Sequence, residues 1–200
     1  MIRGIVPIFR GQPEETIHEV LKRLVDSPVQ AIELSASDTH TAELVKRVTR
    51  QYQERFVVGV GTVFSSLTVA GMAAAGAQFI RSPNVNVHVI RATKEHGLIS
   101  VPGAFTPTEV RAAADYGASM VDLFPAAALS AEFIETLQAV QPDVPLMASG
   151  GVELHQVVMY SGLGIKALGM CRAFFAQAAS AENIAKQIVA TANEWATHSQ

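Results

Sequence analysis

The chain has 200 residues, of which 15 are Lys or Arg and 18 are Asp or Glu, so its formal net charge is −3. This small charge and the lack of any run of Lys or Arg argue against a nucleic-acid partner, and the single cysteine, Cys171, excludes an internal disulfide. No apolar run approaches the roughly 20 residues that span a bilayer, and residues 1–6 lack the apolar core of a signal segment. We therefore expect a cytoplasmic protein without a nucleic-acid or membrane partner.

Short β-branched runs alternate with longer amphipathic stretches along the whole chain. In chain order, this pattern predicts a strand and then a helix in each unit, at 5–9 and 14–25, 30–35 and 39–52, 56–60 and 66–75, 78–81 and 87–96, 98–101 and 107–116, 119–124 and 131–140, 144–148 and 154–160, and 165–170 and 181–195. No linker or low-complexity segment divides these units, so residues 1–200 are expected to form one domain.

Strict alternation of strands and helices requires parallel pairing with right-handed crossovers. Because no spare strand remains, the pattern favours a closed (β/α)8 TIM barrel with short loops over an open doubly wound sheet. In such barrels the functional residues gather at the carboxyl ends of the strands. The polar or unusual residues expected there are Arg10, Glu33, Thr62, Arg81, Ser82, Pro83, Pro102, Gly103, Asp122, Phe124, Ser149, Gly150, Gly151, Cys171 and Arg172.

Glu33 stands in an otherwise apolar strand, between Ile32 and Leu34. A buried carboxylate is costly unless it is paired or protonated, so its presence requires a reason. Proton transfer is one reason, and a structural ion pair inside the barrel is the other. The sequence alone leaves both interpretations open.

Gly150 and Gly151 precede a predicted helix and can offer backbone N–H groups to an anion. Arg172 adds a cation at the end of the next strand, where barrels often bind phosphate. The alternatives are an ordinary glycine turn and an exposed surface arginine. The histidines are scattered without the spacing of a zinc site, and no Gly-rich nucleotide loop occurs, so we expect neither a metal nor a cofactor.

Eight short segments at these strand ends resemble, in order, the bacterial 2-keto-3-deoxy-6-phosphogluconate (KDPG) and 4-hydroxy-2-oxoglutarate (KHG) aldolases. They are Ile-Phe-Arg-Gly at 8–11, Ala-Ile-Glu-Leu at 31–34, Gly-Val-Gly-Thr-Val at 59–63, Ser-Pro-Asn at 82–84, Val-Pro-Gly at 101–103, Thr-Pro-Thr-Glu at 106–109, Leu-Phe-Pro-Ala at 123–126 and Ser-Gly-Gly-Val at 149–152. Each motif is short, but the ordered set covers nearly the whole chain. The first and fourth segments are most similar to the 2-keto-3-deoxy-6-phosphogalactonate branch.

The resemblance implies a homotrimeric barrel that cleaves or forms a C–C bond with pyruvate as one partner. The family uses a Lys amine to form an imine with the keto group of a 2-keto acid or sugar acid phosphate. The resemblance assigns proton transfer to Glu33, and binding of the keto-acid carboxylate to Arg10 and Thr62. It also assigns Pro83 and Phe124 to the pocket wall, and the phosphate to Gly150, Gly151 and a Gly-Ser on the eighth strand.

The sequence departs from the family pattern in three places. Asp122 stands where the imine-forming Lys is expected, and a carboxylate cannot form an imine. Arg81 replaces the usual apolar residue before Ser-Pro, and Cys171-Arg172 replaces the Gly-Ser of the phosphate site. The remaining lysines offer no substitute, because four lie on predicted outer helices and Lys166 begins the eighth strand.

The first two departures are expected to be linked. Side chains alternate along a strand, so Arg81 should face inward with Phe79, and Asp122 with Phe124. Alternate strands of a barrel supply one interior layer, which brings the fourth and sixth strands together and adds Glu33 from the second. We therefore predict that Arg81 pairs with Asp122, and that Glu33 joins the pair.

Two functions fit this sequence, besides a different reaction on the same scaffold. The first is a lyase that acts on keto acids by a changed route, with Glu33 and Asp122 as acid and base or as ligands of a divalent cation that polarises the ketone. The second is a catalytically silent homologue that binds a small anionic keto acid or sugar phosphate through Arg10, Arg81 and Arg172.

Overall fold

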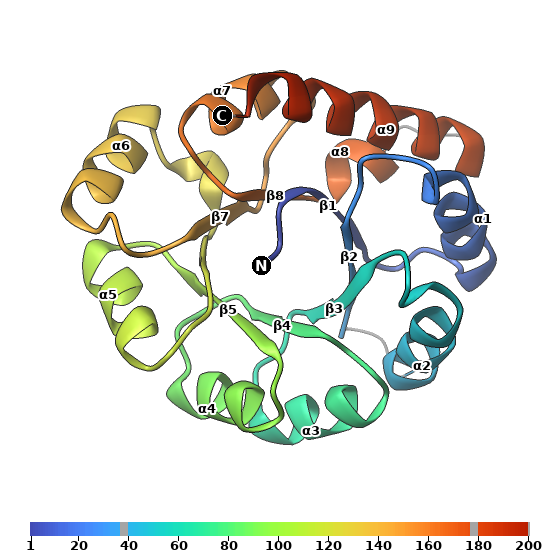
Figure 1. Ribbon diagram of the computed structural model, residues 1–200, viewed down its shortest axis with the longest axis horizontal. Coiled ribbons are helices and arrows are strands. Elements are labelled where there is room, and N and C mark those ends of the chain that lie inside the picture. The colour runs from blue at the N-terminus through green and yellow to red at the C-terminus, as the bar shows by residue number, and fades with distance from the viewer. Residues whose placement is uncertain (37–39, 177–179, 200) are drawn as a thin grey trace.

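A computed structural model describes residues 1–36, 40–176 and 180–199, which fold into a closed barrel (Figure 1). The strands pair in parallel in the order β1 to β8, and β8 closes onto β1. They are β1 Gly4–Phe9, β2 Ala31–Ser35, β3 Val57–Gly61, β4 Phe79–Ser82, β5 Ile99–Ala104, β6 Val121–Leu123, β7 Leu146–Ser149 and β8 Ala167–Met170. The predicted (β/α)8 barrel is confirmed, and the open sheet is excluded.

The helices surround the ring of strands, as Figure 1 shows. They are α1 Glu14–Leu24, α2 Thr41–Tyr52, α3 Ser66–Ala74, α4 Val87–Glu95, α5 Pro107–Asp115, α6 Ala131–Val140, α7 Val157–Gly162, α8 Arg172–Phe175 and α9 Ala181–His198, with 3₁₀ turns η1 Ala126–Ala128 and η2 Leu154–Gln156. In the part of the chain that the structure describes, none of these helices has the length and apolar character of a membrane span.

The predicted helices are confirmed with small differences at their ends. The stretch predicted as one helix at 154–160 divides into η2 and α7, and the short helix α8 was not predicted. A four-residue helix gives too little periodicity to be recognised in a sequence. The predicted start of the second helix, Thr39, lies outside the described residues.

Side-chain caps mark where five of the described helices begin, namely α3, α4, α5, α6 and α9. The clearest case is α5, where the Thr106 hydroxyl accepts from the N–H of Glu109 and the Glu109 carboxylate accepts from the N–H of Thr106. Pro107 occupies the first turn, where a missing N–H costs nothing. Four other helices begin with a side-chain oxygen that accepts a hydrogen bond from a backbone N–H of the first turn. These helices are α3, α4, α6 and α9, and the capping residues are Ser65, Asn86, Ser130 and Ser180.

Two separate apolar clusters result from the alternation of side chains along the strands. The larger one lies between the barrel and the helices. The smaller one is built by residues from around the ring and fills the barrel interior: Ile2, Val6, Ala31, Phe79, Val101, Met120, Met147 and Ala167. Two residues closer to the carboxyl end, the next inward-facing position of four strands carries a polar side chain. These side chains are Glu33, Arg81, Asp122 and Ser149. The interior therefore has an apolar layer and, nearer the carboxyl ends, a polar layer.

Glycines on β3 make room for the large side chains of these two layers. A Cβ atom at Gly59 would overlap the Phe79 ring, and one at Gly61 would overlap the Glu33 carboxylate. The interior is close-packed, so neither neighbour has space to move away. Gly61 is thus a condition for Glu33 to lie where it does.

We expect Gly61→Ala to lower the free energy of unfolding by about 3 kcal/mol or more, because the new methyl group must displace a buried carboxylate. Gly71→Ala is the matched control: Gly71 lies in α3, and no described side chain or neighbouring element comes within 4 Å of the position that a Cβ atom would take there. That change should stabilise the protein by about 0.5–1 kcal/mol. Urea denaturation followed by circular dichroism measures both. Equal effects of the two substitutions would contradict the crowding at Gly61.

Candidate active site

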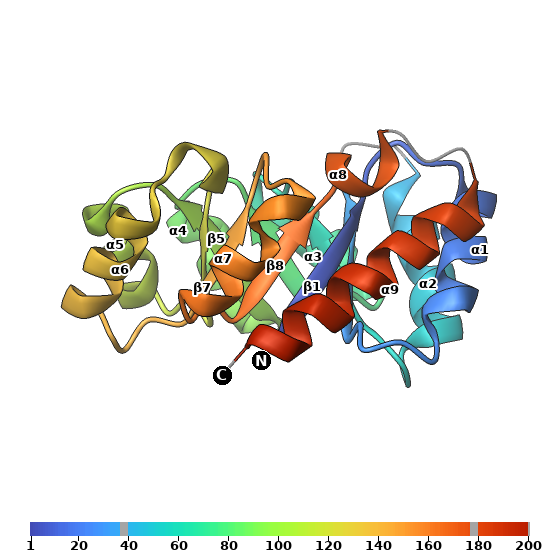
Figure 2. The ribbon, with the colours of Figure 1, turned by 90° about the horizontal axis from the view of Figure 1, so that it is seen from above.

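A cavity of about 690 Å³ opens at the carboxyl ends of the strands. Its wall comes from β1, β4, β7, β8 and the segments that follow β6, β7 and β8, and includes Arg10, Arg81, Phe124, Ser149, Gly150, Gly151, Cys171 and Arg172. Figure 2 shows α8 at this end of the barrel, while the N-terminus and the end of α9 lie at the other end. The unpredicted helix α8 begins at Arg172 and therefore sets the position of one side of the cavity.

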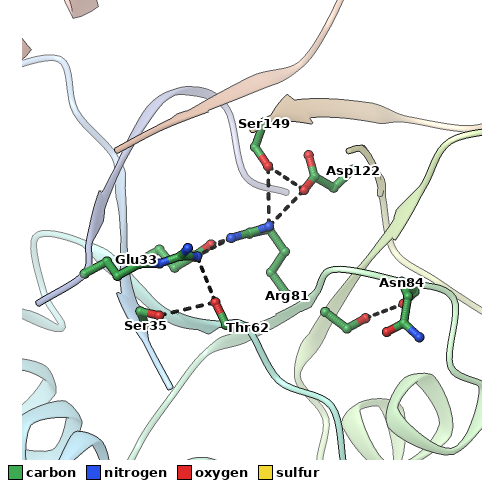
Figure 3. A network of polar contacts seen from close by, with 9 residues as sticks. Glu33, Ser35, Thr62, Arg81, Asn84, Asp122 and Ser149 are labelled. Atoms are coloured by element: carbon green, nitrogen blue, oxygen red, sulfur yellow. Dashed lines mark hydrogen bonds and ion pairs between the residues drawn. The ribbon is translucent and has the colours of Figure 1, made fainter. Parts of the chain in front are cut away.

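Arg81 is the centre of a buried network beneath this cavity (Figure 3). Its Nε and Nη2 atoms donate to the two carboxylate oxygens of Glu33 over 2.6 and 2.7 Å, and its Nη1 lies 3.1 Å from Asp122 Oδ2. The exposed fractions of these side chains are 3% for Arg81 and 0% for both acids. The predicted pairing of Arg81 with Asp122 and Glu33 is confirmed.

Ser149 completes the network; the sequence indicates its place at the end of the seventh strand but not its role in the site. Its hydroxyl donates to Asp122 Oδ2 over 2.7 Å and lies 3.4 Å from Arg81 Nη1. The signal was present, because Ser149 stands two residues after inward-facing Met147 at the end of a barrel strand. Ser149 also belongs to the cavity wall, so it connects the cavity to the buried acid.

Burial dominates the ionisation of Asp122. Desolvation raises the pKa of its carboxyl group to about 6, against the opposing effects of the Arg81 charge and the Ser149 hydrogen bond, and the nearby Glu33 charge adds to the rise. Its second oxygen, Oδ1, has no hydrogen-bond partner within the described residues. For Arg81, desolvation alone lowers the pKa, but the two carboxylates outweigh it and hold the pKa above the usual arginine value.

Arg10 and Thr62 are brought together as well. Arg10 Nη2 donates to Thr62 Oγ1 over 3.0 Å, and Thr62 Oγ1 lies 3.2 Å from the Ser35 hydroxyl. Thr62 has a φ of 64°, an uncommon value for a β-branched residue, at a cost of about 1–3 kcal/mol. Arg10 is exposed in the cavity wall, and in the described chain it forms no ion pair.

Some of the other predicted residues lie in the cavity wall and some do not. Phe124, Gly150, Gly151 and Arg172 lie in the cavity wall, and Arg172 forms an exposed ion pair with Glu153 over 2.9 Å. Pro83 lies outside this wall, with its backbone against Gly103 of β5, so its contact with a ligand stays a prediction. Glu33 and Asp122 lie behind the wall, covered by Arg81 and Ser149.

The carboxylates of Glu33 and Asp122 are already paired with a cation, the Arg81 guanidinium. Both Glu33 oxygens bind Arg81, and so does one oxygen of Asp122. No group of three or more His, Cys, Asp or Glu side chains among residues 1–36, 40–176 and 180–199 is arranged to hold a metal ion. The guanidinium therefore occupies the place that a divalent cation would need between the two acids.

Comparison with known proteins places this barrel in a family. Residues 2–189 match the family model described as KDPG and KHG aldolase. The chain belongs to the KDPG and KHG aldolase family. It is 31% identical over 192 residues to a probable 2-dehydro-3-deoxy-6-phosphogalactonate aldolase of Rhizobium meliloti, covering 96% of this chain and 91% of that one. It is 28% identical over 188 residues to the 2-dehydro-3-deoxy-6-phosphogalactonate aldolase of Escherichia coli, covering 93% and 91%.

Solved structures agree with this aldolase assignment. A structure described as native KDPGal has a TM-score of 0.91 and 25% identity, covering 97% of this chain and 95% of that one. A KDPG aldolase from Legionella pneumophila, with pyruvate captured as a covalent carbinolamine, has a TM-score of 0.82 and 17% identity, covering 99% and 95%. The second likeness shows the fold alone.

No lysine of this aldolase homologue reaches the cavity. The chain has five lysines, Lys22, Lys46, Lys94, Lys166 and Lys186. All five are exposed and described; four lie on α1, α2, α4 and α9, and Lys166 precedes β8 at the far end of the barrel. None belongs to the cavity wall. A side-chain amine is therefore missing from the described surface on which a keto acid would bind.

Asp122→Asn should remove a pH dependence of stability from this protein. Because the folded state raises the pKa of Asp122 from 3.8 to about 6, the favourable contribution of its protonated form is complete below about pH 4 and is lost as the pH rises to about 6. Between these pH values, the free energy of unfolding of the variant should therefore rise by about 3 kcal/mol relative to that of the wild type. Urea denaturation across the pH range measures the difference.

Asp143→Asn is the control of opposite sign for this titration. Asp143 is exposed, and its Arg111 partner lowers its pKa. The stability of the wild type should therefore increase relative to that of this variant as the pH rises. A stability difference between the wild type and Asp122→Asn that stays constant with pH would mean that Asp122 does not titrate in this range.

Glu33→Gln should destabilise the fold at neutral pH by about 3–5 kcal/mol, because Arg81 loses its bidentate partner while it stays buried. Replacing both partners, as in Glu33→Gln with Arg81→Met, should cost less than Glu33→Gln alone, since the buried ion pair is then removed as a unit. Asp122, which loses its Arg81 contact, can take up a proton because burial already raises its pKa. Denaturation of the two variants at one pH makes the comparison. A larger loss in the double variant would show that packing, not charge, decides the effect.

Proposed function

We propose that this protein binds a phosphorylated 2-keto sugar acid, or the 2-keto acid part of one, at the carboxyl ends of its strands, and forms no imine with it. The observation that carries the proposal is the chemistry of the cavity: arginines line it and, among the described residues, no lysine does. Relatives named for 2-dehydro-3-deoxy-6-phosphogalactonate supply the ligand class, which carries a carboxylate and a phosphate.

The cations of the wall differ in how much charge they have left for a ligand. Arg10 donates to a hydroxyl rather than to a carboxylate, so its charge is available. Arg172 shares its charge with Glu153 at an exposed site, where an ion pair is worth little and is readily exchanged. Arg81 is compensated by Glu33 and Asp122. Arg10 and Arg172 are therefore the residues we assign to the carboxylate and the phosphate, with Gly150 and Gly151 beside Arg172.

Asp122 takes the position that the resemblance assigns to the imine-forming lysine. Together with Arg81 it changes which group carries the positive charge inside the barrel. An amine can lose its proton and attack a carbonyl carbon, whereas a guanidinium keeps its proton and does not act as a nucleophile. The pair therefore retains a cation beneath the cavity while it removes the nucleophile.

A lyase that works without an imine is the second candidate. The raised pKa of Asp122 favours it, because a carboxyl group with a pKa near 6 can both take and give a proton near neutral pH. Glu33 is less suited to the role, because Arg81 holds both of its oxygens. Turnover of a phosphorylated 2-keto sugar acid to pyruvate, measured with a coupled dehydrogenase, distinguishes this candidate from binding alone.

Reductive trapping with pyruvate and borohydride tests the absence of an imine. We expect no pyruvate adduct in the intact mass of the wild type. Asp122→Lys alone would place a second buried cation beside Arg81 with only Glu33 to compensate both, so we expect it to fold poorly. In the double variant Asp122→Lys with Arg81→Val, the new amine is the one buried cation of the network and Glu33 is the one acid. This variant should fold and form the adduct. An adduct in the wild type would overturn the proposal.

Binding is tested by calorimetry with pyruvate and with a phosphorylated sugar acid. We expect both to bind the wild type, and Arg10→Ala to weaken them by about tenfold or more, through the loss of a charged hydrogen bond. Arg91→Ala is the matched control, because Arg91 is exposed on α4 and away from the cavity wall. If Arg10→Ala leaves both affinities unchanged, Arg10 does not contact the ligand, and the assignment of the carboxylate to Arg10 is wrong.

The homotrimer and the cytoplasmic location that the sequence suggested remain part of this proposal. Phe64 and Leu67, at the start of α3, are apolar and exposed by 59% and 83% in the single chain, which suits a surface covered by another subunit. Light scattering should give a trimer for the wild type and a smaller species for Leu67→Asp. A monomeric wild type would contradict the trimer.

A further inference from the structure

Asp122 is a buried acid without direct access to the cavity. Its side chain is fully buried and does not belong to the cavity wall. Two wall residues reach it, as Figure 3 shows: the Ser149 hydroxyl at 2.7 Å and Arg81 Nη1 at 3.1 Å. A guanidinium does not release its proton in proteins. The Ser149 hydroxyl is therefore the group that connects Asp122 with the cavity for proton exchange.

The charges of the network do not balance when both acids are ionised. Glu33 binds Arg81 through both oxygens at 2.6 and 2.7 Å, whereas Asp122 contacts it through one oxygen at 3.1 Å. Glu33 and Arg81 thus compensate each other, and the Asp122 charge is left over. Its Oδ1 atom is buried and has no hydrogen-bond partner among the described residues. A proton on Oδ1 removes the excess charge and leaves Oδ2 free to accept from Ser149 and Arg81.

We propose that Asp122 and Ser149 form a proton-binding site behind the cavity wall, so that an anion bound in the cavity is taken up together with one proton. The proposal rests on the anion binding proposed above. Negative charge arriving near Arg81 favours the neutral form of Asp122. The Ser149 hydroxyl passes its proton to Asp122 Oδ2, the oxygen to which it donates, and takes a proton from solvent, so the serine ends unchanged. Rotation of the carboxyl group then exchanges its two oxygens and leaves the new O–H bond at the unpaired Oδ1 position.

The other groups around Asp122 do not supply this titration. Arg81 on β4 stays protonated, and Glu33 on β2 is held by it. Burial raises the pKa of Cys171, which follows β8, so its thiol stays neutral near pH 7. Within the described residues, the cavity wall contains no histidine. Glu153, paired with Arg172, is the one carboxylate in that described wall, so its replacement serves as the control.

Calorimetry with pyruvate, which stays ionised from pH 5 to 8, measures the coupling. Titrations at one pH in two buffers of different ionisation enthalpy give the number of protons taken up. We expect uptake approaching one proton between about pH 6 and 7, and a Kd that rises by up to about tenfold per pH unit above the pKa of the free site. Asp122→Asn should abolish the uptake, and Glu153→Gln should retain it.

The free protein allows a second measurement that does not depend on pyruvate. Carbon-detected NMR of the carboxyl groups should show one aspartate with a midpoint near 6, and its signal should be absent in Asp122→Asn. Ser149→Ala should move that midpoint upward, because the Ser149 hydrogen bond lowers the pKa of Asp122. A merely structural role of Ser149 would leave the midpoint in place.

The outcomes separate this inference from the function on which it rests. Pyruvate binding without proton uptake, or uptake that persists in Asp122→Asn, overturns the proton site and leaves anion binding intact. If pyruvate does not bind at any pH, the anion proposal fails, and proton-coupled uptake fails with it. No carboxyl midpoint above about 5 in the free protein overturns the proton site whatever the binding data show.

Discussion

The arrangement of this barrel depends on one buried ion pair, the bidentate contact of Arg81 with Glu33. Both side chains lie in the barrel interior, where a charge without a partner is very costly. Gly61 lacks a side chain where the Glu33 carboxylate lies, and Asp122 and Ser149 close around the remaining edge of the guanidinium. The polar layer is therefore a single unit, in which each member is held by the charge or shape of another.

This unit lies at the carboxyl ends of the strands, where (β/α)8 barrels carry their functional residues. A guanidinium keeps a cation in the interior but offers no nucleophile, and the acids that contact it lie outside the cavity wall. The cavity above stays open and keeps Arg10 and Arg172 in its wall. In the function proposed above, recognition of an anion and attack on a carbonyl group depend on different side chains, so one can be kept without the other.

The same unit gives the barrel a charge that can change. Arg81 satisfies Glu33 first, through two short contacts, and Asp122 is left as the weaker partner with one oxygen unpaired in the described structure. Burial raises the pKa of this acid to about 6, so its charge changes just below neutral pH. Its protonation state is then open to influence from any charge that enters the cavity, through Arg81 and Ser149.

The sequence by itself determined the barrel and the buried pairing inside it. Alternating strand and helix patterns fixed the eight units, and the two-residue period of a strand placed Glu33, Arg81 and Asp122 on one inward face, from which their pairing followed. Which acid Arg81 would hold more tightly was decided only by the tertiary structure, because it depends on distances between strands that no local pattern encodes. The same holds for Ser149 as the link to Asp122, for α8 over the cavity, and for the burial that raises the pKa of Asp122. These features arise where segments distant in sequence meet, and a sequence records only the neighbours along its own chain.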